Sequence, residues 1–149
     1  MHILKNILKK CLHGNIAVLI WLCYITPFAK AEVVVVVAAK SPITSLSSSQ
    51  VSQIFLGQLV EVPSAGHIIP IDQHEGEKVR NEFYKKVTGK DIPQLKSYWA
   101  KLLFAGYGRP PHSVSDNNEV KKLITENNHR IGYIDKSSVD DSVRIVLMP

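Results

Sequence analysis

The sequence contains little cysteine, and what there is lies near its start. Of 149 residues only Cys11 and Cys23 are cysteines, so residues 32–149 contain none. Those residues cannot form disulfides or thiolate metal sites, and a cysteine-free domain suits an oxidising compartment.

Sequence patterns typical of enzymes are also missing. There is no G-x-S-x-G elbow, no Walker loop, no G-x-G-x-x-G and no H-E-x-x-H motif. The histidines after residue 31 are widely spaced, and their spacing predicts no metal site; they are His67, His74, His112 and His129. We therefore expect a protein that is not an enzyme and needs neither a metal nor a cofactor.

No apolar run is long enough for a membrane-spanning helix, which needs ~20 residues. A shorter apolar stretch opens with residues 16–22 and runs on to Phe28, behind a basic start formed by Lys5, Lys9 and Lys10. The small-x-small sequence Ala29-Lys30-Ala31 follows. This order predicts a signal peptide over residues 1–31, cleaved after Ala31, and a periplasmic domain over residues 32–149.

Two other interpretations of the N-terminal segment are a membrane anchor and a lipid anchor. A membrane anchor is disfavoured because the apolar run is short, so we expect no stable membrane insertion after signal cleavage. A lipid anchor on Cys23 is disfavoured because the bulky residues Trp21 and Leu22 precede it.

Positive charge is concentrated in the predicted signal peptide. It holds four of the eighteen Lys and Arg residues and none of the thirteen acidic ones, which leaves fourteen against thirteen, a net charge of +1. The sequence pI near 9.2 therefore gives no reason to expect nucleic-acid binding. The remaining 118 residues are enough for one hydrophobic core.

Strand and helix signals alternate after residue 32. Residues 33–37 are an unbroken run of valine, which predicts a strand buried on both faces. Helices are expected after Ser47, where Gln50 completes a capping box, over residues 76–87, from Pro93, and after Asp116, where Glu119 completes a second box. Further strands are expected over residues 67–72, 131–134 and 143–147, with a short edge segment over residues 58–62.

Apolar positions along the predicted helices indicate which faces are buried. Val51, Ile54 and Phe55 share one face of the first helix. In the helix that begins at Pro93, four residues share a face and are expected in the core; they are Leu95, Trp99, Leu102 and Leu103. Alternating strands and helices predict a single α/β domain with helices on a sheet.

The segment 72–83 is the best candidate binding site. A strand, a glycine-containing loop and a helix start follow one another there, which directs free backbone N–H groups at an anion. The candidate ligand-binding residues are His74, Gly76, Glu77, Lys78 and Arg80. The competing interpretation is an ordinary strand-to-helix loop with Arg80 solvated or in a salt bridge, and Glu75 and Glu77 would repel an anion.

Three segments resemble the substrate-binding proteins of phosphate ABC transporters. Residues 45–57 follow the family pattern L-S/T-x-x-Q-x-x-x-I-F-x-G, Arg80 and Phe83 match the end of R-x-x-G-S-G-T-R-x-x-F, and residues 130–134 match G-A-I-G-Y-V. The resemblance covers nearly all of residues 33–147. It implies the fold of one lobe of a periplasmic binding protein, with a mixed sheet flanked by helices.

The sequence departs from this family where the anion is held. The G-S-G-T segment is replaced by residues 75–79, which lack the hydroxyl donors and carry two carboxylates. Family members have two lobes that close on the ligand, whereas 118 residues correspond to one lobe and half a site.

Two functional hypotheses follow. The first is a periplasmic binding-protein-like domain related to the phosphate-uptake family, with a small anion such as phosphate as its ligand and a membrane transporter or another periplasmic protein as its partner. The alternative is a periplasmic interaction or adaptor module that keeps the fold and has lost the ligand.

The predicted processing can be checked on the protein recovered from expressing cells. We expect its N-terminus to be Glu32, because a signal peptidase cleaves after a small-x-small sequence. Mass spectrometry of the purified protein tests this. An intact Met1, or a lipid on Cys23, would show the prediction to be wrong.

Overall fold

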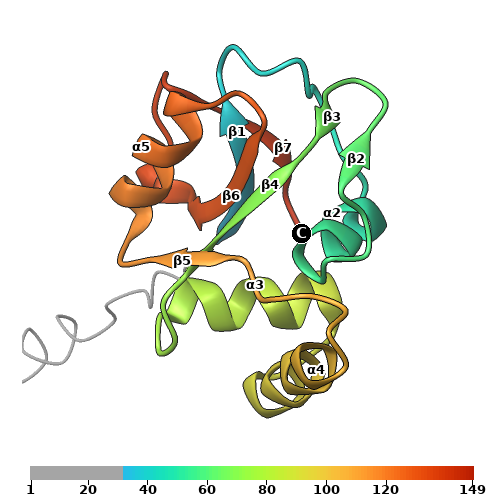
Figure 1. Ribbon diagram of the computed structural model, residues 1–149. Helices are drawn as coiled ribbons and strands as arrows, with labels where there is room; N and C mark the ends of the chain where they lie inside the picture. The colour runs from blue at the N-terminus through green and yellow to red at the C-terminus, as the bar shows by residue number, and fades with distance from the viewer. Residues whose placement is uncertain (1–31) are drawn as a thin grey trace, which may run out of the picture. The chain divides into compact units, whose positions relative to one another are not determined.

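The structure, a computed structural model, describes residues 32–149, so the predicted signal peptide lies outside the described residues. A five-stranded mixed sheet with the order β5-β4-β6-β1-β7 forms its centre (Figure 1). The strands are β1 (Val33–Ala38), β4 (Ile69–Gln73), β5 (His112–Val114), β6 (Arg130–Asp135) and β7 (Val143–Leu147). Strand β4 runs parallel to β5 and β6, whereas β1 is antiparallel to β6 and β7.

Helices cover both faces of this sheet. They are α2 (Ser48–Phe55), α3 (Lys78–Thr88), α4 (Ile92–Phe104) and α5 (Asn117–Glu126). Buried side chains of α2, α3 and α4 belong to the core on one face, and those of α5 belong to the core on the other. The predicted α/β fold, with helices flanking a mixed sheet, is confirmed.

The valine run of β1 explains why the sheet is buried on both faces. Val33, Val35 and Val37 contribute to the core with α2 and α3, and Val34 and Val36 contribute to the core with α5. Successive side chains of a strand point to opposite faces, so a strand between two helical layers must be apolar throughout. The prediction of a fully buried strand is confirmed.

The expected start of α2 is also confirmed. The Ser47 hydroxyl accepts a hydrogen bond from the Gln50 backbone N–H, and the Gln50 side chain accepts one from the Ser47 N–H. Val51, Ile54 and Phe55 are buried as predicted. A comparable box that the sequence analysis missed joins Asp91 and Gln94 at the start of α4.

Several expected boundaries differ from those observed. The segment predicted as one strand over residues 67–72 is divided between β3 (Gly66–His67), which pairs with β2 (Glu61–Val62) in a hairpin, and β4. Pro70 is tolerated because it pairs with β6 only, while β5 pairs with β4 from Ile71 onward. Helix α3 begins at Lys78 rather than residue 76, since Gly76 adopts a φ of 96° that no helix contains.

Two other predictions are corrected by side-chain positions. Leu103 is 54% exposed, so it is not a core residue, because α4 extends beyond the elements on which it packs. Glu119 does not complete a capping box with Asp116: its carboxylate accepts hydrogen bonds from the N–H and hydroxyl of Ser115. Asp116 does cap α5, through the N–H groups of Asn118 and Glu119.

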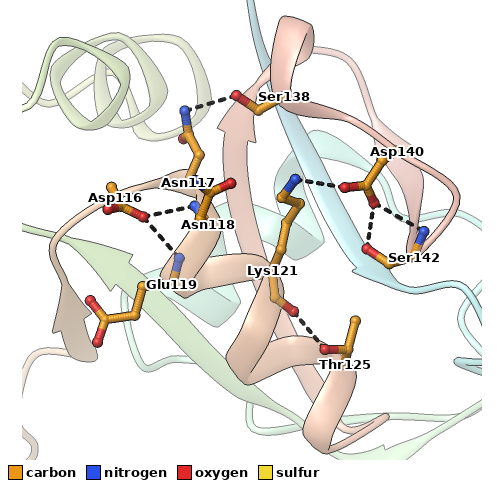
Figure 2. Close-up of polar contacts among 9 residues, drawn as sticks. All are labelled: Asp116, Asn117, Asn118, Glu119, Lys121, Thr125, Ser138, Asp140 and Ser142. Carbon is orange, nitrogen blue, oxygen red and sulfur yellow. Dashed lines mark hydrogen bonds and ion pairs between the residues drawn. The ribbon is translucent and has the colours of Figure 1, made fainter.

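Helix α5 is tied to the loop that follows β6, as Figure 2 shows. The Lys121 ammonium lies 2.7 Å from Asp140 Oδ2, and the Asn117 amide donates to the Ser138 hydroxyl at 3.2 Å. Hydrogen bonds from Lys121 and Ser142 lower the pKa of Asp140 to about 2. These contacts hold α5 against β6 by polar groups at its outer side, while Val120 and Ile124 pack inside.

No helix among residues 32–149 is both long enough and apolar enough to cross a membrane.

The close approach of α5 to β6 gives a stability prediction. A Cβ at Gly132 would lie 2.5 Å from Val120 Cγ1, so Gly132→Ala must displace the Val120 side chain or α5 itself. We expect a loss of about 1–3 kcal/mol, the usual cost of overpacking a core. The midpoint of urea unfolding measures it. Gly108→Ala is the matched control, since Gly108 has open space around it and no positive φ; equal midpoints for the two variants would contradict the expected contact.

Candidate functional site

A cavity of about 290 Å³ lies where β4 and β5 end and α3 begins. Parallel strands place their carboxyl ends at one edge of a sheet, and in α/β folds that edge is where ligands bind. The lining includes charged, polar and aromatic side chains from β4, β5, α3 and α4; the chief ones are Asp72, Gln73, Glu75, Arg80, Lys96, Trp99 and Ser113.

Asp72 is the buried carboxylate of the cavity, with 2% of its surface exposed. One oxygen accepts hydrogen bonds from the Gln73 N–H at 2.8 Å and from the Tyr133 hydroxyl. The other accepts from the Tyr84 hydroxyl at 3.0 Å and from Arg80 Nε at 3.3 Å. Its acceptor positions are therefore occupied by protein donors, which offset the cost of burying the charge.

Arg80 is held in place by this carboxylate. It is 7% exposed, and its guanidinium carbon lies 5.2 Å from the centre of the Tyr84 ring. The Nε–H is used by Asp72, but buried Nη1 has no hydrogen-bond acceptor among the described residues. Buried donors are seldom left without a partner. Asp72 thus orients a cation whose outer nitrogen is free to bind an acceptor.

The two tyrosines are fixed as donors by their surroundings. Burial, and then the Asp72 carboxylate, raises the pKa of Tyr84 and of Tyr133 well above 10. Both hydroxyls therefore stay protonated at neutral pH. The rings belong to the aromatic core: Phe83 and Tyr133 stack with centres 4.0 Å apart and an interplanar angle of 8°.

Gln73 connects the cavity with α5. Its side-chain amide donates to Asn117 Oδ1 at 3.0 Å and to the carbonyl of Tyr133 at 2.9 Å. Asn117 is the first residue of α5, so the end of β4 and the start of α5 are held by one buried amide. The floor of the cavity is consequently rigid.

An ion pair lies at the rim. Lys96 Nζ of α4 is 2.9 Å from Glu75 Oε2, and both side chains are more than half exposed. The hydrogen bond from Lys96 lowers the pKa of Glu75. Because each charge is already compensated, the carboxylate of Glu75 repels an anion less than its position in the sequence suggests.

Trp99 forms one wall of the cavity. It is 7% exposed, and a Cβ at Gly57 would lie 3.3 Å from Cη2 of the indole. The buried Nε1–H has no acceptor among residues 32–149. The cavity is therefore lined by two side chains, Arg80 and Trp99, that each carry a buried and unused N–H donor.

The five residues predicted from sequence are not all brought together. Arg80 lines the cavity, whereas His74, Gly76, Glu77 and Lys78 are exposed and are not part of its lining. Glu77 is the N-cap of α3 but makes no side-chain hydrogen bond to the first turn. Glu75, which the sequence analysis considered only as a charge that repels an anion, lies at the rim of the cavity.

Sequence reasoning missed Asp72, Gln73, Tyr84 and Tyr133 as parts of the site, and treated Trp99 as a core residue only. One signal was available: a carboxylate and an amide at the end of an apolar strand need buried partners. The partners themselves are 12 and 61 residues away from Asp72, and no periodicity indicates such pairs.

Metal ligands do not gather in the described part of the chain. Residues 32–149 hold no group of three or more His, Asp or Glu side chains placed to bind a metal ion. All four histidines of this part are exposed.

Three solved structures share this architecture. They are a phosphate ABC transporter substrate-binding protein of Clostridium perfringens with bound phosphate (21% identity, TM-score 0.60), an ABC-type phosphate transport receptor of Vibrio cholerae (21%, 0.62) and PstS of Borrelia burgdorferi (17%, 0.51). The chain has the fold of these three proteins. At the level of the fold, the resemblance stated from the sequence motifs is confirmed.

The match is partial in length. Each structure covers 77% of this chain, and the chain covers only 44%, 45% and 46% of the three proteins in turn. No family profile and no curated protein matches the sequence.

The buried pair of Asp72 and Arg80 gives a second stability prediction. Asp72→Asn leaves the guanidinium buried without its counter-charge, so we expect a loss of about 3–5 kcal/mol in urea unfolding. Glu75→Gln, which breaks the exposed pair with Lys96, is expected to leave the unfolding midpoint unchanged.

A double variant keeps this test decisive if Asp72→Asn does not fold. Combining it with Arg80→Met removes both charges, and stability should then be largely regained. An Asp72→Asn protein as stable as the natural one would contradict the role given to this pair.

Proposed function

We propose that this chain is a periplasmic binding protein, not an enzyme, that holds a small oxyanion such as phosphate in the cavity of Asp72, Arg80 and Trp99. The observation that carries the proposal is the pair of buried N–H donors on Arg80 and Trp99 that lack a protein acceptor. An unpaired buried donor costs about 1–3 kcal/mol, so a ligand that supplies acceptors relieves that cost. An oxyanion has several acceptor oxygens and little volume.

The charges of the cavity agree with a small anion. Asp72 is saturated by its four donors and Glu75 is paired with Lys96, so neither carboxylate needs to face the ligand. Arg80 offers its outer nitrogen, and guanidinium donors bind oxyanions strongly. Ser113 also lines the cavity and supplies a hydroxyl, the group that residues 75–79 lack.

The size of the cavity favours the same class of ligand. Its volume of about 290 Å³ lies at the lower end of the range for ligand pockets. Phosphate or sulfate would fit, whereas a large cofactor would not.

The solved relatives support phosphate as the first ligand to test. The Clostridium perfringens protein contains bound phosphate, and the Vibrio cholerae protein is described as a phosphate transport receptor. The same role here would require export to the periplasm, as the N-terminal sequence predicts, and a membrane transporter as partner.

The binding is expected to be weak. The chain spans less than half the length of the proteins it resembles, and residues 75–79 carry two carboxylates and no hydroxyl donor. We expect a Kd no tighter than ~1 mM, equivalent to about −4 kcal/mol.

The alternative function is an interaction module that keeps the fold without the ligand and acts by contacting another periplasmic protein. The two carboxylates of the loop before α3, Glu75 and Glu77, favour it because they would repel an anion. The two functions differ in whether a small anion stabilises the isolated protein.

Thermal unfolding with and without phosphate separates them. At ten times a Kd of ~1 mM, phosphate should stabilise the protein by about 1.4 kcal/mol. Trp99→Phe and Lys96→Gln should each reduce this effect several-fold, because the first removes an unused donor and the second leaves the Glu75 carboxylate at the rim without its counter-charge. Lys78→Gln is the matched control: it removes an exposed lysine that does not line the cavity. Sodium chloride at equal ionic strength corrects for screening.

Two results would overturn the proposal. If neither phosphate, sulfate nor small carboxylates stabilise the protein, the interaction module is favoured. If Lys78→Gln removes the effect and Lys96→Gln does not, the anion binds at the loop of residues 74–78 instead of in the cavity.

A further inference from the structure

The end of α4 and the loop after it form an exposed apolar tip, defined here as residues 101–109. Leu103 is 54%, Phe104 92% and Tyr107 84% exposed. An aromatic side chain has roughly 150–250 Å² of surface to bury, so the two rings leave on the order of 300 Å² uncovered. That equals the largest apolar patch of many monomers, and such patches are often functional. Figure 1 shows α4 as the outermost helix, beyond α3.

The tip lies in a segment from which negative charge is absent. Residues 92–115 contain Lys96, Lys101 and Arg109 but no Asp or Glu. Among the other residues of 32–149, eleven basic residues stand against thirteen acidic ones. Lys101 and Arg109 at the two ends of the tip form no ion pair with any residue of the described part.

An apolar groove of about 260 Å³ adjoins the tip through Arg109. Its walls are largely aliphatic, and its only ionisable side chains are Arg109, His67 and His112. The groove therefore extends the apolar surface of the tip, and its one Lys or Arg side chain, Arg109, is shared with the tip.

A second copy of the chain does not suit this surface. Two tips facing each other would place Lys101 and Arg109 of each copy against the same charges. The exposed rings of two copies would also bury well under the 1,200–2,000 Å² of a typical stable interface, by roughly half. A partner that is apolar and negatively charged suits it on both counts.

We propose that the tip docks reversibly on a bilayer surface that contains anionic phospholipid. Phe104 and Leu103 would enter the boundary between headgroups and acyl chains, and Tyr107 would lie at headgroup level, where amphipathic rings are favoured. Lys101 and Arg109 would contact the phosphates, and each cation strengthens attraction to an anionic surface. This is adsorption of a helix end, distinct from the insertion of a spanning helix, and it does not depend on anion binding in the cavity.

Vesicle sedimentation tests the proposal. The protein as recovered from cells is mixed with vesicles of phosphatidylcholine alone or of phosphatidylcholine and phosphatidylglycerol. We expect binding to the anionic vesicles to be stronger on the order of tenfold or more, and to fall as salt is added. Since all variants share one N-terminus, differences between them belong to the substituted residues.

Matched variants separate the apolar and charged contributions. Phe104→Ser with Tyr107→Ser should weaken binding to anionic vesicles at least about tenfold, given the apolar area that two aromatic rings contribute. Lys101→Gln with Arg109→Gln should reduce it to the level seen with neutral vesicles. Met148→Ser, an exposed apolar residue of the C-terminal tail, and Lys122→Gln, an exposed lysine of α5, are controls expected to change nothing.

Three outcomes would overturn the proposal. The first is equal binding to neutral and anionic vesicles. The second is binding by the tip variants that is as strong as that of the natural protein. The third is a dimer, seen by sedimentation equilibrium, that the tip variants abolish while vesicle binding is unchanged; a second copy would then be the partner. The double variant Asp72→Asn with Arg80→Met, which changes only the cavity, should leave vesicle binding unaffected, so this test and that of the cavity can fail separately.

Discussion

Burial of the Asp72 carboxylate constrains the rest of the site. A charge removed from water in this way must be matched by donors, and here they come from β4, α3 and β6: the Gln73 N–H, Arg80 with Tyr84, and Tyr133. These donors reach Asp72 only if α3 packs on the sheet with Arg80 and Tyr84 beside the end of β4, and if β6 pairs next to β4. The same contacts leave one guanidinium nitrogen without a partner, so the interactions that stabilise the fold also produce the free donor on which the proposed anion binding rests.

The sequence predicted features that depend on neighbours along the chain. The valine run of β1, the capping box of Ser47 and Gln50, and the glycine after α2 are local patterns, and each is present in the structure. The candidate site was predicted less well because its contacts join residues 12 to 61 positions apart. Helical periodicity also placed Leu103 in the core, since periodicity identifies a face and does not tell how far along the helix that face is covered.

Arg80 shows how two competing interpretations of one residue can both apply. From the sequence, a salt-bridged arginine and an anion-binding arginine were alternatives. In the structure the salt bridge uses Nε, while Nη1 lies buried without an acceptor in a lined cavity. A guanidinium has five N–H donors in a rigid plane, so one edge can be fixed by a carboxylate while another faces a ligand. A lysine at this position could not divide its donors in this way.

The two ends of helix α4 have different surroundings. This explains why Leu103, which helical periodicity predicts to be buried, is exposed. The first two turns of the helix supply Leu95 to the core and Lys96 and Trp99 to the cavity. In its last turn Leu102 still packs against the core, but Phe104, the most exposed of the large apolar side chains in the described part, does not. Exposed aromatic residues at a helix end bring no folding stability, and a surface selected for solubility would not retain them. The exposure of apolar residues that helical periodicity predicts to be buried is therefore a reason to assign the tip an external partner. The absence of acidic residues from 92–115 favours a partner with negative charge.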